Sequence, residues 1–182
     1  MRIIAGSRKG ARIFAPGGSE TRPTGDRVRE AAFNLIGPVD GMEVLDLFAG
    51  SGAMGLEALS RGAARATFVE SDRAAAQAIV RNLEKLDFED ASVVRLDVGR
   101  KLATDATAGR RYDLVLIDPP YRMLTGFLPV LEAHLPAVVA PEGLVVVESD
   151  AREHAHALGL YEDPSLVVRG GAHHATEVVI GA

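Results

Sequence analysis

The sequence has 182 residues, of which 47% are hydrophobic and 25% are charged, and these values are typical of one soluble globular domain. It contains no cysteine, which excludes disulfides, thiolate metal ligands and a thiol nucleophile. No apolar run approaches the ~20 residues needed to cross a bilayer, and the first residues lack the apolar stretch of a signal peptide, so we expect a cytoplasmic protein that does not bind a membrane.

The formal net charge of −5 conceals a basic N-terminal part. Residues 1–29 carry seven basic and two acidic side chains, whereas the remaining residues carry 13 basic and 23 acidic ones. A basic segment on an acidic protein can bind a phosphate backbone locally, although the same charges also suit a solvated terminus. The residues that we expect to contact a nucleic acid are Arg2, Arg8, Lys9, Arg12, Arg22 and Arg27.

The N-terminal part predicts a short β-hairpin, a linker and then a helix. Residues 2–6 and 12–16 flank a basic Ser-Arg-Lys-Gly turn, and a stretch rich in glycine, proline and threonine follows. We therefore divide the chain into a basic hairpin and linker at residues 1–24 and one larger domain at residues 25–182. Asp26 is placed to cap the helix. The residues expected on its apolar face are Val28, Ala31, Ala32, Leu35 and Ile36.

After this helix, strands alternate with helices, an order that predicts a doubly wound, mostly parallel α/β sheet of Rossmann-like topology. The clearest helix covers Arg73–Leu86, where apolar residues recur at helical spacing. Residues 165–169 and 176–180 flank two glycines and predict an antiparallel pair that closes the sheet. Ligands are expected at the carboxyl ends of the parallel strands. The expected parallel strands, mostly continuous apolar runs, are Val44–Phe48, Ala66–Glu70, Ser92–Asp97, Tyr112–Asp118 and Leu144–Glu148.

A glycine-rich loop joins the first of these strands to a helix. Its glycines, Gly50, Gly52 and Gly55, fit the pattern G-x-G-x-x-G, and Glu70 follows 20 residues after Gly50. Nicotinamide-dinucleotide proteins carry the same pattern, so the glycines alone do not distinguish that cofactor from S-adenosylmethionine.

Of three carboxylates near this loop, Asp46 favours S-adenosylmethionine, whereas Glu70 would serve the ribose diol that either cofactor provides. Asp46 lies in an otherwise apolar strand, where an unpaired charge is costly, and the cofactor's ammonium offers a cation that a dinucleotide lacks. Glu70 can accept two hydrogen bonds from a ribose diol, and Asp97 can either accept one from the adenine amino group or cap the next helix. The expected cofactor-binding residues are Asp46, Phe48, Gly50, Ser51, Gly52, Glu70, Ser71, Asp97, Val98 and Asp118.

The tetrapeptide Asp118-Pro119-Pro120-Tyr121 follows the fourth expected strand directly. Its two prolines end the strand and fix a rigid, extended exit, and the alternative interpretation is a Pro-Pro turn with a capping aspartate. The Asp118 carboxylate and the Pro119 carbonyl can hold both hydrogens of an amino group on a base, while stacking on Tyr121 contributes about 1–3 kcal/mol. We expect these four residues to be catalytic, because positioning the nitrogen against the sulfonium methyl supplies most of the rate.

Together these motifs resemble the bacterial 16S ribosomal RNA guanine-N2 methyltransferases. The resemblance runs over nearly the whole chain and rests on residues 2–6, 22–34, 47–63, 69–73 and 118–121. It implies a class I S-adenosylmethionine-dependent methyltransferase fold, a flipped guanine held by the tetrapeptide, RNA contact by the basic hairpin, and a helix that closes over the cofactor. It also implies that the substrate is 16S RNA within the small ribosomal subunit or an assembly intermediate. We expect the enzyme to be a monomer.

Two other functions remain open. Amino methylation of DNA, at adenine N6 or cytosine N4, uses the same tetrapeptide, although the chain leaves no room for a separate target-recognition domain. A nicotinamide-dependent oxidoreductase would use the glycines, but the sequence has no Tyr-x-x-x-Lys pair, and this function leaves the tetrapeptide unused. The five histidines have no zinc-site spacing, so no metal is expected. The turn containing His173 and His174 departs from the family pattern, and its role stays open.

Overall fold

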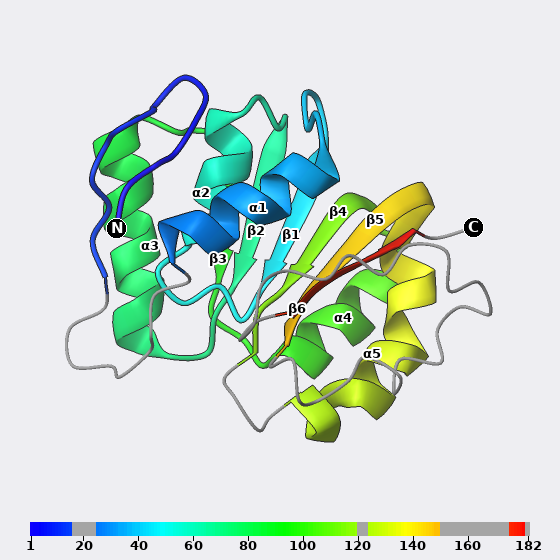
Figure 1. The fold of residues 1–182 in the computed structure, drawn as a ribbon. Coiled ribbons are helices and arrows are strands. Elements are labelled where there is room, and N and C mark those ends of the chain that lie inside the picture. Colours follow the sequence, from blue (N-terminus) through cyan, green and yellow to red (C-terminus); the bar gives the residue numbers. More distant parts are fainter. Residues whose placement is uncertain (16–24, 120–123, 150–174, 181–182) are drawn as a thin grey trace.

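The computed structural model describes residues 1–15, 25–119, 124–149 and 175–180. Helices cover both faces of one sheet (Figure 1). In chain order the elements are α1 (Asp26–Ile36), β1 (Glu43–Leu47), α2 (Ala53–Ser60), β2 (Arg65–Val69), α3 (Arg73–Leu86), β3 (Ala91–Val94), α4 (Val98–Thr107), β4 (Tyr112–Ile117), α5 (Leu124–Val138), β5 (Val139–Ser149) and β6 (Ala175–Ile180).

The sheet has the strand order β3-β2-β1-β4-β5-β6, with every neighbouring pair parallel except β5 and β6. The order reverses between β1 and β4, and ligands of doubly wound sheets bind at such a reversal. The register is level there, because Leu47 of β1 pairs with Val69 of β2 and with Ile117 of β4. The predicted doubly wound fold with an antiparallel C-terminal strand is confirmed, while residues 165–169 lie outside the described residues.

Alternate residues of the central strands enter two separate cores. On β1, Val44 faces a cluster formed with α1, α2 and α3, whereas Leu45 and Leu47 face a cluster formed with α4 and α5. Burying each such side chain contributes about 1.5–3 kcal/mol, so continuous apolar strands are stabilised on both faces. Asp46 alternates with these residues and is therefore carried toward the α2 side, where its carboxylate meets the backbone of Gly55.

Helix α1 differs from its prediction in two ways. Its N-cap is Gly25, and Asp26 is the first helical residue, whose carboxylate contacts Arg29 at 3.0 Å and Arg2 at 3.4 Å. The buried face is also rotated, because Phe33 and the fully buried Arg29 take the places expected for Ala31 and Leu35. A guanidinium is tolerated inside because Glu57 of α2 lies 3.6 Å from it, a partner that helical periodicity cannot reveal.

The predicted N-terminal hairpin is present as one antiparallel bridge, between Arg2 and Arg12, and it packs closely on the domain. Ile3 and Ile13 are buried in the same core as α1, α2 and α3. The fully buried Glu57 accepts hydrogen bonds from the backbone nitrogens of Ile4 and Ala5, at 2.8 and 2.9 Å. Residues 1–14, which we call the N-terminal segment, therefore share the core of the larger domain.

The remaining boundaries follow local chemistry. Helix α3 covers the predicted range and is capped by Asp72, which accepts from the Ala75 nitrogen at 2.8 Å. Strand β3 ends at Val94, earlier than predicted, and Asp97 becomes the N-cap of α4. Strand β5 begins at Val139, five residues before the expected start. In the part of the chain that the structure describes, no helix combines the length and apolarity needed to cross a membrane.

Candidate active site

The candidate site lies where β1, β2 and β4 end. Because Leu47, Val69 and Ile117 are level in the sheet, the residues that follow them emerge at the same edge. These are the start of the glycine loop after β1, Glu70 after β2 and Asp118 after β4. The structure thus brings together the three motifs that the sequence singled out, at the point where a doubly wound sheet binds its ligand.

The glycine loop needs its glycines for two physical reasons. Gly50 and Gly52 have φ values of 54° and 79°, which other residues adopt only with strain. A Cβ on Gly52 would also lie 3.2 Å from Ile79, and one on Gly55 would collide with the Phe68 ring. Phe48 takes a φ of 58° without being glycine, a strained conformation of the kind that recurs at ligand sites.

Two of the predicted cofactor-binding carboxylates hold this loop by its backbone. Glu70 accepts from the nitrogens of Gly50 and Asp72, each at 2.8 Å, through different oxygens. Asp46 accepts from the nitrogen of Gly55 at 2.9 Å. Each carboxylate has about four acceptor positions, so both retain capacity for further donors.

The Asp46 carboxylate lies in an acidic and dry environment. The pKa of Asp46 is raised from 3.8 to about 7, mainly by burial; the Gly55 hydrogen bond lowers it, and the negative charges of Asp118 and Glu70 contribute to the rise. Within residues 1–15, 25–119, 124–149 and 175–180, no lysine or arginine forms an ion pair with Asp46. A cationic ligand would therefore gain an unusually strong interaction there, because little water competes for the charge.

The tetrapeptide that the sequence predicts to be catalytic lies only partly within the described residues. Asp118 is half-buried and Pro119 is buried at the end of β4, while Pro120 and Tyr121 lie outside the described residues. Phe48 of the glycine loop contacts Phe127 of α5, with ring centroids 4.9 Å apart in an edge-to-face arrangement. This contact joins the loop to the helix that follows the tetrapeptide, and the sequence analysis missed Phe127.

The other predicted cofactor residues lie around the same edge. Asp97 is exposed, and its Oδ1 accepts from the Arg100 nitrogen at 3.2 Å, so the capping role that the sequence left open is observed. Val98 is buried in the α4–α5 core. Ser71 is exposed after β2, and Ser51 is half-buried between the two loop glycines.

Among the predicted RNA-binding arginines and lysine, one side chain is bound to other parts of the protein and four are exposed. Arg8 donates to the Leu86 carbonyl at 2.6 Å and lies over the Phe88 ring at 5.5 Å, so the fold itself uses this side chain. The exposed residues of the set are Arg2, Lys9, Arg12 and Arg27, and Arg22 lies outside the described residues.

Sequence reasoning missed two further basic residues beside this group. Arg81 and Lys85 of α3 lie over the ring of Phe14, at 4.5 and 4.7 Å from its centroid. Their i,i+4 spacing on the polar face of the predicted helix was the available signal. Both are exposed and lie beside Phe14 of the N-terminal segment.

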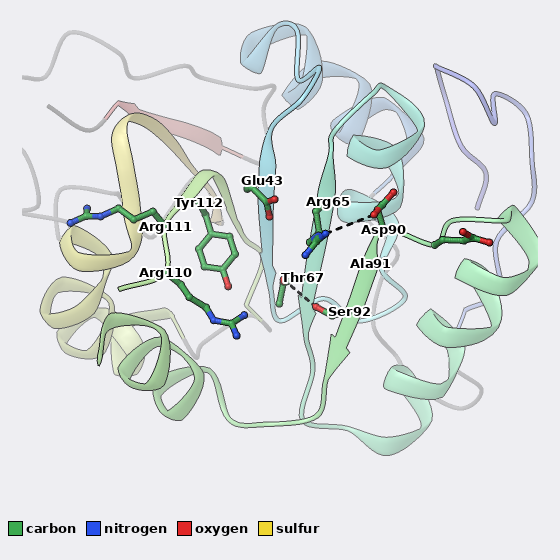
Figure 2. A pocket seen from close by; sticks show the side chains of 10 residues that line it. Glu43, Arg65, Thr67, Asp90, Ala91, Ser92, Arg110, Arg111 and Tyr112 are labelled. Carbon is green, nitrogen blue, oxygen red and sulfur yellow. Dashed lines mark hydrogen bonds and ion pairs between the residues drawn. The ribbon is translucent and has the colours of Figure 1, made fainter. Parts of the chain in front are cut away.

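A hollow of about 740 Å³ lies at the opposite edge of the sheet, where β1 to β4 begin (Figure 2). Arg65 and Asp90 face each other across it at 3.8 Å, and the Ser92 hydroxyl donates to Thr67 at 3.2 Å. Its charges are balanced, and none of its lining residues belongs to the predicted site. The charged residues that line it are Glu43, Arg65, Glu89, Asp90, Arg110 and Arg111.

Behind this hollow lies a buried polar cluster of Lys101, Asp105 and Tyr112. The Tyr112 hydroxyl donates to Asp105 at 2.8 Å, Lys101 donates to the same carboxylate oxygen, and Arg110 lies 3.8 Å from the other oxygen. Burial and the Asp105 carboxylate raise the pKa of Tyr112 to about 12, so its hydroxyl stays protonated. Among the described residues, no group of three or more histidines or carboxylates is placed to hold a metal ion.

Comparison with known proteins agrees with this geometry. A family model described as conserved hypothetical protein 95 matches residues 1–162. A putative rRNA methyltransferase, YlbH, of Bacillus subtilis is 41% identical over 154 residues, which are 82% of this chain and 83% of that protein. The ribosomal RNA small subunit methyltransferase D of Escherichia coli K12 is 42% identical over 153 residues, covering 82% and 75% of the two chains. A solved putative methyltransferase from Escherichia coli is 36% identical with a TM-score of 0.78, covering 99% of this chain and 97% of that one.

The sheet order and the glycine loop at its reversal, together with these likenesses, define the class: the protein is a class I S-adenosylmethionine-dependent methyltransferase. Within this class, the chain belongs to the family described as conserved hypothetical protein 95. The predicted fold class, enzyme class, cofactor and family are therefore confirmed.

Proposed function

We propose that this enzyme transfers a methyl group from S-adenosylmethionine to the N2 amino group of a guanine in the 16S RNA of the small ribosomal subunit. The observation that carries the proposal is the meeting of Asp46, Glu70 and Asp118 at the ends of three level strands, beside the glycine loop. The names of two relatives, an rRNA methyltransferase and a small-subunit rRNA methyltransferase, support an RNA substrate.

The site suits the cofactor in its charge and in its hydrogen-bond acceptors. The cofactor supplies a sulfonium methyl group and carries an ammonium, for which the buried Asp46 carboxylate offers an anionic partner. Glu70 fixes the loop with one hydrogen bond to each oxygen and can accept from a ribose diol through its remaining lone pairs. Because the Asp97 Oδ1 caps α4, the other oxygen is the one that would meet the adenine amino group.

The chain's contribution to the reaction is to orient a weakly nucleophilic amino group. We assign the two N–H hydrogens to the Asp118 carboxylate and the Pro119 carbonyl, which follow β4 directly. Two acceptors held by a rigid backbone favour the pyramidal nitrogen and aim its lone pair. The nitrogen becomes acidic only after it has gained the methyl group, and Asp118 is the hydrogen-bonded carboxylate that can take the proton. Tyr121 is proposed to stack on the base.

The substrate would be gripped by the basic N-terminal part. We propose that Arg2, Arg8, Lys9, Arg12, Arg22 and Arg27 contact RNA phosphates, and that residues 1–24 serve substrate binding while residues 25–182 perform the chemistry. We further propose that the enzyme is a monomer that acts in the cytoplasm on the small subunit or an assembly intermediate.

The decisive experiment offers purified small subunits, naked 16S RNA and duplex DNA to the enzyme with radiolabelled S-adenosylmethionine. We expect label in the subunit RNA, at a guanine that resists reverse transcription when mapped. Label in DNA alone would overturn the RNA substrate, and label at a base position other than an exocyclic nitrogen would overturn the role of the tetrapeptide. A thermal-shift comparison with NAD(H) provides the matched test of the cofactor.

A further inference from the structure

Asn82, on α3, links two parts of the molecule that are far apart in the sequence. Its side chain is fully buried and makes three hydrogen bonds. Oδ1 accepts from the Phe14 nitrogen at 2.7 Å, and Nδ2 donates to the Phe14 carbonyl at 3.0 Å and to the Ser51 carbonyl at 3.1 Å. One amide thus joins the N-terminal segment to the centre of the glycine loop.

The orientation of this amide is determined by its partners. A primary amide has two N–H donors and one carbonyl oxygen, and here each donor and the oxygen have a partner. Phe14 takes one donor and the oxygen together, as a neighbouring β-strand would, which directs the second donor at Ser51. Ser51 contacts the amide nitrogen alone, whereas Phe14 pairs with both the nitrogen and the oxygen, so the Phe14 backbone supplies two of the three restraints on the amide.

Ser51 is a position where such a restraint matters. It lies between Gly50 and Gly52, and glycines allow the intervening peptide groups to rotate with little steric resistance. The N-terminal segment reaches the same residue a second time, since the Met1 sulfur lies 3.8 Å from the Ser51 hydroxyl. Met1 is placed in turn by its carbonyl, which accepts from the Ile13 nitrogen at 3.2 Å.

The segment has other anchors that do not involve the loop. Ser60 donates to the Ala5 carbonyl at 2.6 Å and accepts from the Arg8 nitrogen at 3.0 Å. Ser60 is buried like Asn82 and holds the same segment by the same kind of bond. Ser60 therefore attaches only the N-terminal segment, whereas Asn82 attaches the segment and also contacts the glycine loop.

We propose that the N-terminal segment is a structural part of the cofactor site, and that Asn82 is the positioning residue through which it holds the Ser51 peptide for cofactor binding. The inference rests on the proposed placement of the cofactor at Gly50–Gly52. It also changes how a truncation must be interpreted, because deleting residues 1–14 removes a support of the cofactor loop together with the basic side chains. Side-chain changes at Lys9 and Arg12 are the cleaner test of RNA contact.

The test is isothermal titration of S-adenosylhomocysteine into the full chain without RNA, at a temperature well below unfolding. Asn82→Asp keeps the size of the side chain but turns its donor into an oxygen that faces two carbonyls. We expect the cofactor Kd to rise about tenfold, which corresponds to about 1.4 kcal/mol. Phe14→Pro removes the N–H that orients the amide, together with the ring that Arg81 and Lys85 contact, and we expect a smaller rise in the same direction.

Ser60→Ala is the matched control, expected to lower the melting temperature while leaving the Kd within twofold. An unchanged Kd in both Asn82→Asp and Phe14→Pro, or an equal rise in Ser60→Ala, would overturn the inference. Gly52→Val distinguishes its failure from that of the proposed site, because a side chain there meets Ile79 and Phe68 directly. If Gly52→Val loses the cofactor and Asn82→Asp does not, only the positioning role fails, whereas retention in Gly52→Val would remove the cofactor from this loop.

Discussion

Two buried carboxylates, at opposite edges of the sheet, have equal exposure and opposite environments. Asp46 and Asp105 are each 2% exposed. Asp105 is surrounded by two cations, Lys101 and Arg110, and by the Tyr112 hydroxyl, which donates to it. Asp46 accepts from one backbone nitrogen, and the nearby charges that act on it belong to carboxylates.

The difference separates a carboxylate that stabilises the fold from one that is prepared for a ligand. A buried charge is tolerated when the fold supplies cations and hydrogen bonds, as at Asp105. At Asp46 the raised pKa records an unfavourable position that a cationic ligand would relieve. Substitutions at the Asp105 edge should therefore change stability, and substitutions at the Asp46 edge should change ligand affinity.

The largest expected effect is on stability, at the structural edge. Asp105→Ala leaves the Lys101 ammonium buried without its carboxylate, and removing one partner of such a pair costs about 3–5 kcal/mol. Denaturant unfolding should therefore show a much lower midpoint, with cofactor affinity unchanged in the fraction that remains folded. Weaker cofactor binding by the fully folded variant would contradict a purely structural role of Asp105. Lys101→Met with Asp105→Leu, which removes both charges, should recover much of the stability.

The next largest effect is on catalysis. Asp118→Ala removes one of the two proposed acceptors for the amino group, and loss of a positioned hydrogen-bonding group typically lowers kcat by ~10²–10³-fold. Cofactor affinity should change little in the same variant. Single-turnover methyl transfer to small subunits measures the first quantity, and calorimetry measures the second. Loss of both would assign Asp118 a structural role.

Asp46→Asn tests whether the Asp46 carboxylate binds the cofactor. The amide keeps an oxygen for the Gly55 nitrogen but loses the charge for an ammonium, and hydrogen bonds to charged groups contribute about 1.5–3 kcal/mol. We expect cofactor affinity to fall by roughly 10–100-fold and thermal stability to be unchanged or higher, because a buried charge has been removed. A large loss of stability would make Asp46 another structural carboxylate.

Ionisation of Asp46 with pH should change cofactor affinity several-fold. The pKa of Asp46 is raised from 3.8 to about 7, so the folded state binds its proton more tightly than the unfolded chain does. Its contribution to stability is therefore complete below pH 3.8 and is lost as the pH rises through 7. Cofactor affinity should do the reverse, rising between pH 6 and about 7.5 as the carboxylate ionises. Both pH dependences should be weaker in Asp46→Asn, as melting curves and titrations at each pH would reveal.

The site could be predicted from the sequence where it depends on strand ends. Asp46 lies near the end of a buried strand, and Glu70 and Asp118 each directly follow one. Parallel strands bring their carboxyl ends together. Spacing along the chain was therefore enough to collect them. The role of Asp97 stayed open for the same reason, because an aspartate before a helix suits a cap and a ligand equally.

The contacts that cross between elements could not be predicted in this way. Arg29 interrupts the apolar face of α1 and is buried because Glu57 is nearby, which no local pattern encodes. Asn82 looked like a polar residue on a helix, and only the fold brings it against both Phe14 and Ser51. The buried Lys101 likewise contacts the Tyr112 hydroxyl of β4, at 3.3 Å. Helical periodicity therefore does not predict which polar groups pair between different elements of the fold.

The smallest effect returns to the structural edge. Tyr112→Phe removes one neutral hydrogen bond to Asp105 while Lys101 still pairs with that carboxylate, so the free energy of unfolding should fall by only about 1 kcal/mol. Denaturant unfolding measures the change, and methyl transfer and cofactor Kd should match the unmodified protein. The value is informative because Tyr112 also lines the hollow of Figure 2. A change in transfer rate with stability preserved would show that the two edges of the sheet communicate, and the division between a structural and a ligand-binding carboxylate would then be too simple.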